Sequence, residues 1–278
     1  MKKLLMLVCG IVALFLIIYI PLTAGKDSAS GNENEEYEYE YYYNDSSDGG
    51  EYMDDAQSQA VSGDMSAPGI DVNPDSYTVF VNKEYGLPKD YVPDDLMVPD
   101  IRFYGGFSEE KSYMRKDAGL AIEKMFSDAE KEGYVLYGIS GYRSYARQEE
   151  IYNKNVTMHG STETNKVSAE PGHSEHQSGL TIDISIAELT GSLLEEFGST
   201  EEGIWVKENC SKYGYIIRYP KNKEKVTGYS YEPWHLRYVG KKMAEYLTEN
   251  KLTLEEYFNY IPISAYTDSI ISDVQIIP

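Results

Sequence analysis

Two short stretches contain three of the four histidines of this 278-residue chain. The first ends at Asp183 and includes His176, and the second is a Tyr-Glu-Pro-Trp-His segment that ends at His235. Imidazole nitrogen and carboxylate oxygen are both ligands that zinc accepts, and a catalytic zinc keeps one position for water. We therefore predict one zinc ion on His176, Asp183 and His235, with Glu232 as the base that takes a proton from the attacking water.

The backbone of both stretches must bend for these groups to meet. Residues 179–184 form a short β-rich run, and Gly172 and Gly179 allow the loop before it to fold back on itself. A residue that precedes proline is pushed toward an extended conformation, so Glu232 is not expected to be helical. In a regular strand Glu232 and His235 would point to opposite faces of the sheet, and we therefore predict a bend at Pro233.

Taken together, the two stretches are more specific than either one alone. A histidine and an aspartate at this spacing are common by chance and usually mark a solvated loop. The pair of stretches resembles the VanY-type zinc D-alanyl-D-alanine carboxypeptidase family, including the related L,D-carboxypeptidases. The matching positions are Ser174-x-His176-x-x-Gly179-x-Thr181-x-Asp183 and Glu232-Pro233-Trp234-His235. Thr181 stands where the family often has alanine, and the similarity spans roughly residues 73–260.

The resemblance implies an activity and further site residues. It implies hydrolysis of the peptide bond that releases a terminal D-alanine from the stem peptides of bacterial peptidoglycan. It also implies that Arg143 polarises the scissile carbonyl and stabilises the oxyanion, while Gln148, Ser174 and Tyr219 contact the peptide. From its position alone, between a predicted strand and a predicted helix, Arg143 could instead form a surface ion pair with a nearby glutamate.

Several functions remain open at this point. We expect the D-Ala-D-Ala bond to be cut. The alternative is the L,D bond one residue further in, because the same zinc ligands and base serve both activities. A wall-binding module on the same fold would not use a base such as Glu232. A sensor that works through its tyrosine-rich linker would have no peptidase activity.

The first 75 residues differ in composition from the rest. Two lysines precede a 19-residue run without charge at positions 4–22, which is long enough to cross a bilayer. We predict a membrane anchor or signal peptide over residues 1–25, with the catalytic domain outside the cytoplasm, or secreted if this segment is cleaved. Residues 26–75 contain 14 acidic residues and one lysine. We therefore predict a disordered, acidic, Tyr-rich linker over residues 26–72.

The remainder is predicted to be one zinc carboxypeptidase domain over residues 73–263 with a tail at 264–278. The net charge of −21 argues against a nucleic-acid partner, which leaves the stem peptide and the membrane as expected partners. The fold class is α+β, with an antiparallel sheet that has helices on one face and the zinc site on the other. Hydrophobic spacing and turn residues predict helices at 108–133, 145–153, 202–212, 241–249 and 254–260, and strands at 135–139, 215–219 and 236–239. Ser144 is expected to cap the second of these helices, and Ile204 is expected to face the core from the third.

Three smaller expectations complete the prediction. Residues 153–169 are polar and rich in turn residues, so His159 is expected in an exposed loop. His173 lies in the site loop without a metal role. Cys210 is the only cysteine beyond the predicted membrane segment, so we expect it to be buried, unreactive and not part of a disulfide within the domain.

Overall fold

The computed structural model describes residues 69–161, 164–165 and 168–261. The predicted membrane segment 1–25, most of the linker 26–72 and the tail 264–278 lie outside these residues and remain predictions. Within the described part of the chain, no helix has both the length and the apolar character needed to span a bilayer.

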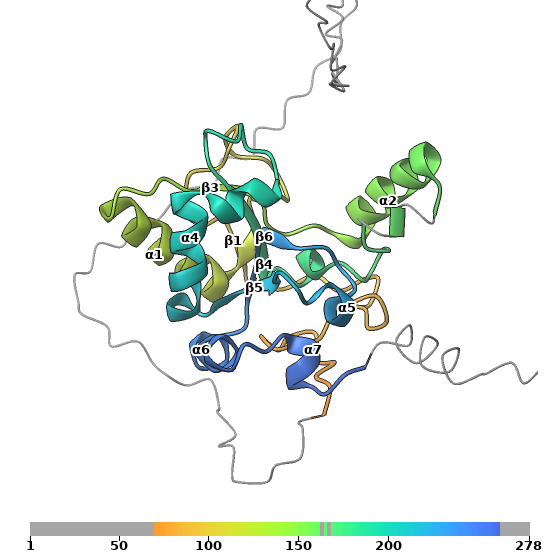
Figure 1. Cartoon of the computed structure of the whole chain (residues 1–278). Helices are drawn as coiled ribbons and strands as arrows, with labels where there is room; N and C mark the ends of the chain where they lie inside the picture. The colour runs from red at the N-terminus through yellow and green to blue at the C-terminus, as the bar shows by residue number, and fades with distance from the viewer. Residues whose placement is uncertain (1–68, 162–163, 166–167, 262–278) are drawn as a thin grey trace, which may run out of the picture. The chain divides into compact units, whose positions relative to one another are not determined.

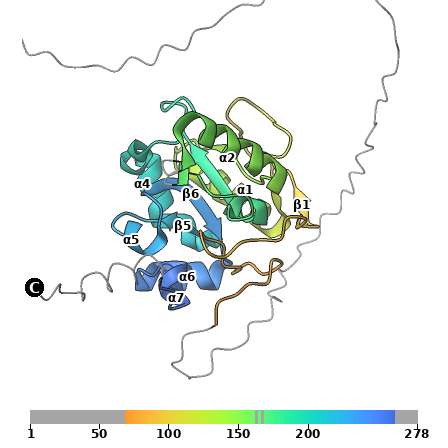
Figure 2. The same ribbon diagram turned by 90° about the vertical axis from the view of Figure 1, so that its right-hand side faces the viewer.

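Four antiparallel strands form the central sheet, in the order β3-β4-β6-β5 (Figures 1 and 2). Their bounds are β3 Tyr137–Ser140, β4 Thr181–Ser185, β6 Glu232–Tyr238 and β5 Tyr215–Tyr219. A separate two-stranded sheet pairs β1, Leu96–Met97, with β2, Met114–Arg115. The antiparallel sheet with helices confirms the α+β fold class.

The helices differ widely in length. The α-helices are α1 Lys116–Lys131, α2 Tyr145–His159, α4 Glu201–Asn209, α5 Glu224–Thr227, α6 Lys241–Asn250 and α7 Leu254–Tyr257. The short 3₁₀ turns are η1 Glu175–Ser178, η2 Glu195–Ser199 and η3 Cys210–Tyr213. In Figure 1, α1 and α4 lie on one side of the sheet and α2 on the other.

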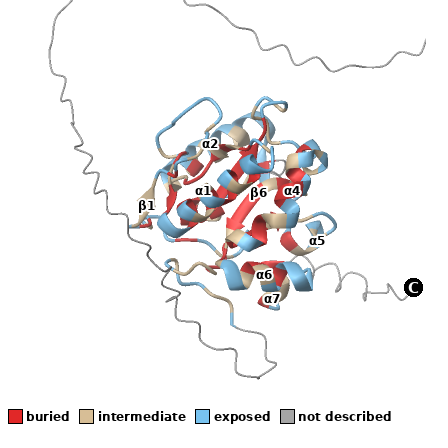
Figure 3. Cartoon of the chain, turned by 90° about the vertical axis from the view of Figure 1, so that its left-hand side faces the viewer, coloured by how far each residue is buried: buried red, intermediate tan, exposed pale blue. Residues whose placement is uncertain are grey.

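Strand β4 separates the apolar core from the polar site. Ile182 and Ile184 point into the main core, which also contains residues of α1 and α4 such as Ile122 and Val206. Successive side chains of a strand point to opposite faces, so Asp183 lies on the other face. All five residues of β4 are buried, and Figure 3 shows buried residues along the neighbouring β6. The polar face is therefore covered as well as the apolar one.

Several predicted elements differ from the structure in their bounds or in the residues that they bury. Helix α1 begins at Lys116 rather than Ser108, because Met114 belongs to β2 and pairs with Met97. Helix α2 continues to His159, so the predicted loop after residue 153 was wrong there, although His159 is exposed as expected. Ile204 was expected to face the core, but 45% of its surface is exposed on α4.

Other expectations were confirmed. Ser144 caps α2, because its hydroxyl accepts a hydrogen bond from the backbone N–H of Arg147 at 3.2 Å. Cys210 is 3% exposed and makes no disulfide within the described residues. Burial raises the pKa of its thiol to about 12, and a thiol that stays protonated at neutral pH is a poor nucleophile.

Candidate metal centre

Strand pairing places two of the predicted ligands side by side. Asp183 of β4 lies directly opposite His235 of β6, and it also pairs with Ser140 of β3. Residues opposite each other in antiparallel strands point to the same face, so the carboxylate and the imidazole meet without any loop rearrangement. The sheet register therefore brings together two of the three predicted ligands.

The third predicted ligand arrives from the turn η1. His176 lies in this turn, which ends at Gly179 in the left-handed conformation with φ +69°. A Cβ on Gly179 would lie 2.9 Å from Cγ of Arg115, so the tight return into β4 requires glycine. Gly172, with φ +89°, makes the other bend of the loop. The predicted role of both glycines is confirmed.

The three side chains form a tight group. His176 Nε2 lies 3.3 Å from Asp183 Oδ2, and His235 Nδ1 lies 3.1 Å from Asp183 Oδ1. Within the described residues they are the one group of three histidine, cysteine or carboxylate side chains with ligand atoms all within 4.8 Å of one another. Each of the three is about 5% exposed or less. The three predicted ligands therefore lie together in the folded chain.

These groups fit a zinc ion by geometry and by chemistry. Zinc bonds of about 2.0–2.1 Å at tetrahedral angles put neighbouring ligand atoms about 3.3 Å apart, close to the separations found here. Asp183 Oδ1 is buried and accepts no well-formed hydrogen bond from the described residues, a costly state that a bound cation would relieve. Burial acts to raise the pKa of Asp183, but His176 and His235 outweigh it and hold the pKa well below its usual value. The carboxylate is therefore ionised, as a ligand must be.

The two imidazoles present different nitrogens to the site. His176 Nδ1 lies 2.7 Å from the carbonyl oxygen of Gly141, so its Nε2 is the atom that faces Asp183. His235 faces Asp183 with Nδ1 instead. A hydrogen bond at one ring nitrogen fixes which nitrogen remains free for a metal.

Glu232 lies next to this group without being part of it. Its Oε2 is 3.6 Å from His235 Nδ1, and its side chain is 21% exposed. The register between β5 and β6 slips at this point, because Ile217 pairs with Leu236 while Tyr219 pairs with Glu232. The irregularity confirms the predicted bend near the proline. Burial raises the pKa of Glu232 to about 7, with His235 acting in the opposite direction, so the carboxyl can both accept and return a proton near neutral pH.

Arg143 lies in the connection between β3 and α2, with its guanidinium held in place. It donates to Gln148 Oε1 at 2.9 Å and to Ser140 Oγ at 3.2 Å. Burial lowers its pKa, while Asp183 acts to raise it. Because its backbone N–H also donates to the carbonyl oxygen of His176 at 3.2 Å, the arginine and the ligand turn are joined directly.

The three predicted substrate contacts occupy different surroundings. Gln148 is 2% exposed, and its amide donates to the carbonyl oxygen of Ala169 at 2.6 Å while its oxygen accepts from Arg143. The ring of Tyr219 packs against His235 with ring centroids 4.8 Å apart and the two planes tilted by 41°. Ser174 is buried immediately before η1. Contact of these residues with a peptide remains a prediction.

Sequence reasoning missed Glu175, the residue beside His176. Its carboxylate is buried and accepts from Arg218 Nε at 2.8 Å and from Arg237 Nη1 at 2.7 Å. Burial acts to raise the pKa of Glu175, but the two arginines outweigh it and hold the pKa far below its usual value. A glutamate in a polar loop is normally expected to be exposed to solvent. Its burial could be predicted only from a fold that brings distant arginines to it.

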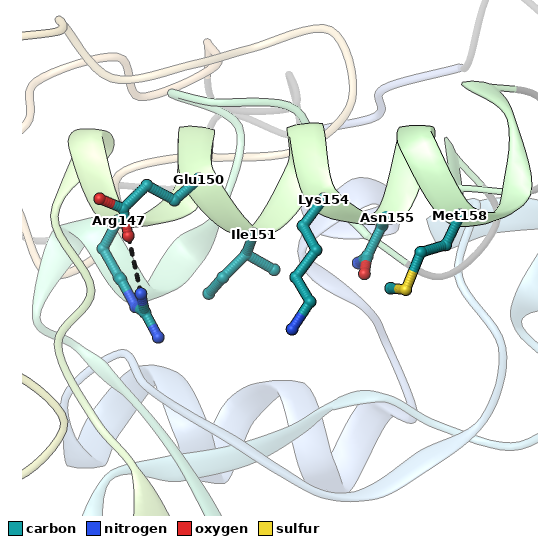
Figure 4. A pocket seen from close by; sticks show the side chains of 6 residues that line it. All are labelled: Arg147, Glu150, Ile151, Lys154, Asn155 and Met158. Carbon is teal, nitrogen blue, oxygen red and sulfur yellow. Dashed lines mark hydrogen bonds and ion pairs between the residues drawn. The ribbon is translucent and has the colours of Figure 1, made fainter. Parts of the chain in front are cut away.

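Two surface pockets are lined by none of the three residues of the metal group. One, of about 340 Å³, runs along α2 (Figure 4) and is lined by Arg147, Glu150, Ile151, Lys154, Asn155 and Met158. None of the predicted site residues lines it, and Arg147 is paired with Glu150 at 2.7 Å. The other, of about 130 Å³, includes Lys83 and His173, whose Nδ1 lies 2.8 Å from the carbonyl oxygen of Asn82. His173 is not among the three residues of the metal group, and its role stays a prediction.

Comparisons with known proteins show which family the chain resembles. The family model described as VanY, D-alanyl-D-alanine carboxypeptidase, matches residues 111–241. The putative carboxypeptidase YodJ of Bacillus subtilis (strain 168) is 51% identical over 189 residues, which cover 68% of this chain and 69% of YodJ.

Two solved structures extend the comparison. One, reported as the LdcB LD-carboxypeptidase, is 51% identical with a TM-score of 0.66 over 68% of this chain and 89% of that chain. The other, a mutant of the vancomycin resistance D,D-pentapeptidase VanY in complex with Zn(II), is 30% identical with a TM-score of 0.53 over 66% of this chain and 99% of that chain. The chain belongs to the VanY family of D-alanyl-D-alanine carboxypeptidases, and it is a metallo-carboxypeptidase.

Proposed function

We propose that the chain removes a C-terminal D-alanine from peptidoglycan stem peptides, using one zinc ion held by His176, Asp183 and His235. The observation that carries the proposal is the buried group of these three side chains, with a fourth side chain, Glu232, beside it and outside it. The zinc-bound structure of the VanY relative and the names of the similar carboxypeptidases support the same metal and substrate class.

Each residue has a separate task in this proposal. Bound zinc would supply a Lewis acid and lower the pKa of the attacking water. Glu232 takes the proton from that water and delivers it to the leaving amine. Arg143, fixed by Gln148 and Ser140, donates hydrogen bonds to the oxygen that becomes negative during the attack. An aspartate ligand leaves the metal less positive than a third histidine would, which increases the need for that arginine.

Two bonds are candidates for cleavage. The sequence led us to expect the D-Ala-D-Ala bond of pentapeptide stems, with the L,D bond of tetrapeptide stems as the alternative. The identity to the LD-carboxypeptidase LdcB is 51%, against 30% to the D,D-pentapeptidase, and this difference favours the L,D bond. Similarity over the sheet and the ligands supports both activities, so the choice depends on side chains that contact the peptide.

Digestion of defined stem peptides tests this proposal. The purified protein is incubated with pentapeptide and tetrapeptide stems, with and without a chelator, and the products are weighed by mass spectrometry. Loss of one alanine from the tetrapeptide indicates an L,D-carboxypeptidase, and loss from the pentapeptide a D,D-carboxypeptidase. A protein that releases alanine from neither peptide, with zinc bound, would instead support a wall-binding module.

We also propose that the enzyme works outside the cytoplasm, anchored by the apolar run at residues 4–22. The run is long enough to cross a bilayer, and the two lysines before it favour an orientation with the following chain outside. Peptidoglycan lies on that side of the membrane. Cell fractionation tests the proposal, which requires the protein in the membrane fraction and accessible to external protease.

Replacing Arg143 with lysine is expected to lower kcat/KM by about 10²–10³ without loss of zinc, because an ammonium group cannot reproduce the two directed guanidinium hydrogen bonds. Steady-state kinetics and zinc analysis of the purified variant measure both quantities. Arg147→Lys is the matched control, since Arg147 is half exposed and paired with Glu150. Equal losses in the two variants would remove the proposed role of Arg143.

A further inference from the structure

His235 lies between two carboxylates. Its Nδ1 is 3.1 Å from Asp183 Oδ1, and its Nε2 is 3.4 Å from Glu175 Oε2. A neutral imidazole carries its proton on one nitrogen only, and the nitrogen without the proton is the one that can bind a metal. The group that faces Nε2 therefore decides whether Nδ1 is available to a metal.

The two oxygens of Glu175 have different partners. Oε1 accepts from both Arg218 and Arg237, at 2.8 and 2.7 Å. Neither arginine bonds to Oε2, whose neighbours are the Thr181 hydroxyl at 3.5 Å and His235 Nε2. Oε2 is thus the oxygen that can accept a hydrogen bond from the imidazole of His235.

The arginines that hold Glu175 are fixed in turn. Arg218 forms a bidentate ion pair with Glu255 of α7, in which its Nη1 and Nη2 donate to the two carboxylate oxygens at 2.8 and 2.6 Å. Arg237 donates to the carbonyl oxygens of Tyr77 and Val79 at 3.0 and 2.8 Å. The side chains of both arginines are fully buried. A carboxylate held by two such groups at one oxygen keeps its other oxygen in one direction.

We propose that Glu175 is a positioning residue for the metal centre: it accepts the Nε2–H of His235 and thereby presents Nδ1 of that imidazole to the zinc. The inference rests on the proposed zinc function. The Gly141 carbonyl orients His176 in the same way, so each imidazole is oriented by its own acceptor. Partners of this kind orient ligands and raise their affinity for the metal.

A purely structural role would be to neutralise the two buried arginines. Glu255 neutralises Arg218 in the same network. Both of its hydrogen bonds from Arg218 are made away from His235, which bonds to Glu175 instead. Glu255→Gln therefore disturbs the ionic network without changing the acceptor at the imidazole. It is the matched control for a change at Glu175.

The test compares zinc binding by wild type, Glu175→Gln and Glu255→Gln in the full-length protein. The metal is first removed, and the zinc Kd is then measured by competition with a chromophoric chelator, while circular dichroism reports the Tm. Glu175→Gln is expected to weaken zinc binding about 10- to 100-fold. Glu255→Gln is expected to lower the Tm and leave the zinc Kd unchanged.

A second variant guards against loss of folding. Glu175→Asp keeps the negative charge beside the arginines but withdraws the carboxylate by one methylene group, so weaker zinc binding is expected here too. An unchanged zinc Kd in either folded Glu175 variant overturns the inference, as does an equal weakening in Glu255→Gln. A wild-type protein that binds no zinc overturns the proposed function itself, whereas tight wild-type binding with unchanged variants overturns this inference alone.

Discussion

Glu232→Gln is expected to reduce kcat/KM on the stem peptide by about 10²–10⁴ while the protein keeps its zinc. Glutamine has nearly the same shape as glutamate but cannot accept the proton of the attacking water. Glu232 lies outside the group of three ligands, 3.6 Å from His235 Nδ1, so the metal should remain bound. Steady-state kinetics and zinc analysis of the same preparation measure both effects.

The control for this variant is Glu208→Gln, which makes the same chemical change on the exposed surface of α4. It should keep full activity. Loss of zinc from Glu232→Gln would show that Glu232 is a ligand rather than the base. Normal turnover in that variant would place the base elsewhere.

Asp183→Asn is expected to remove zinc binding and lower activity by at least about 10³-fold, since a metal contributes several kcal/mol to such reactions. Asparagine keeps the shape of the side chain but lacks the charge that a zinc ligand supplies. Zinc present at 100 times its Kd stabilises a folded protein by about 2.7 kcal/mol, so the wild type should gain Tm on zinc addition. The variant should show no such gain.

Thermal unfolding with and without zinc measures this difference. Asp90→Asn, a change at an exposed loop position, is the matched control and should respond to zinc as the wild type does. If zinc stabilises Asp183→Asn to the same extent as the wild type, the ion binds elsewhere, and the assignment of Asp183 as a zinc ligand is wrong.

Much of the fold follows from local sequence patterns. Strand β5 lies where residues 215–219 predicted it, and Ser144 caps α2 as expected. The start of α1 could not be predicted, because Met114 fits the helical spacing of the residues after it. Its pairing with Met97 in β1 depends on a contact 17 residues away along the chain. Local periodicity does not contain that information.

The site was predictable to the extent that its residues carry a specific spacing. His176, Asp183 and His235 were identified because two motifs hold rare residues at positions that match one family. The register that places Asp183 opposite His235 was not predictable, since strand order depends on the whole sheet. The bend at Glu232 was predictable, because proline restricts the backbone of the residue before it.

The partners of Glu175 and Gln148 could not be predicted from the sequence. Glu175 is buried only because Arg218 and Arg237, 43 and 62 residues away in the chain, meet it inside the protein. Gln148 was assigned to the substrate, yet the structure shows it bonded to Arg143 and to the carbonyl oxygen of Ala169. A charged side chain is stable in the core only beside suitable partners, and local sequence patterns do not show which distant residues these are.

The most direct test of the zinc site is an anomalous difference map from a crystal of the purified protein grown with zinc, with data collected on both sides of the zinc absorption edge. One strong peak is expected within bonding distance of His176 Nε2, Asp183 and His235 Nδ1, with Glu232 outside that distance. A peak elsewhere, or a zinc ion bound directly by Glu232 in place of one of these three, would contradict this expectation.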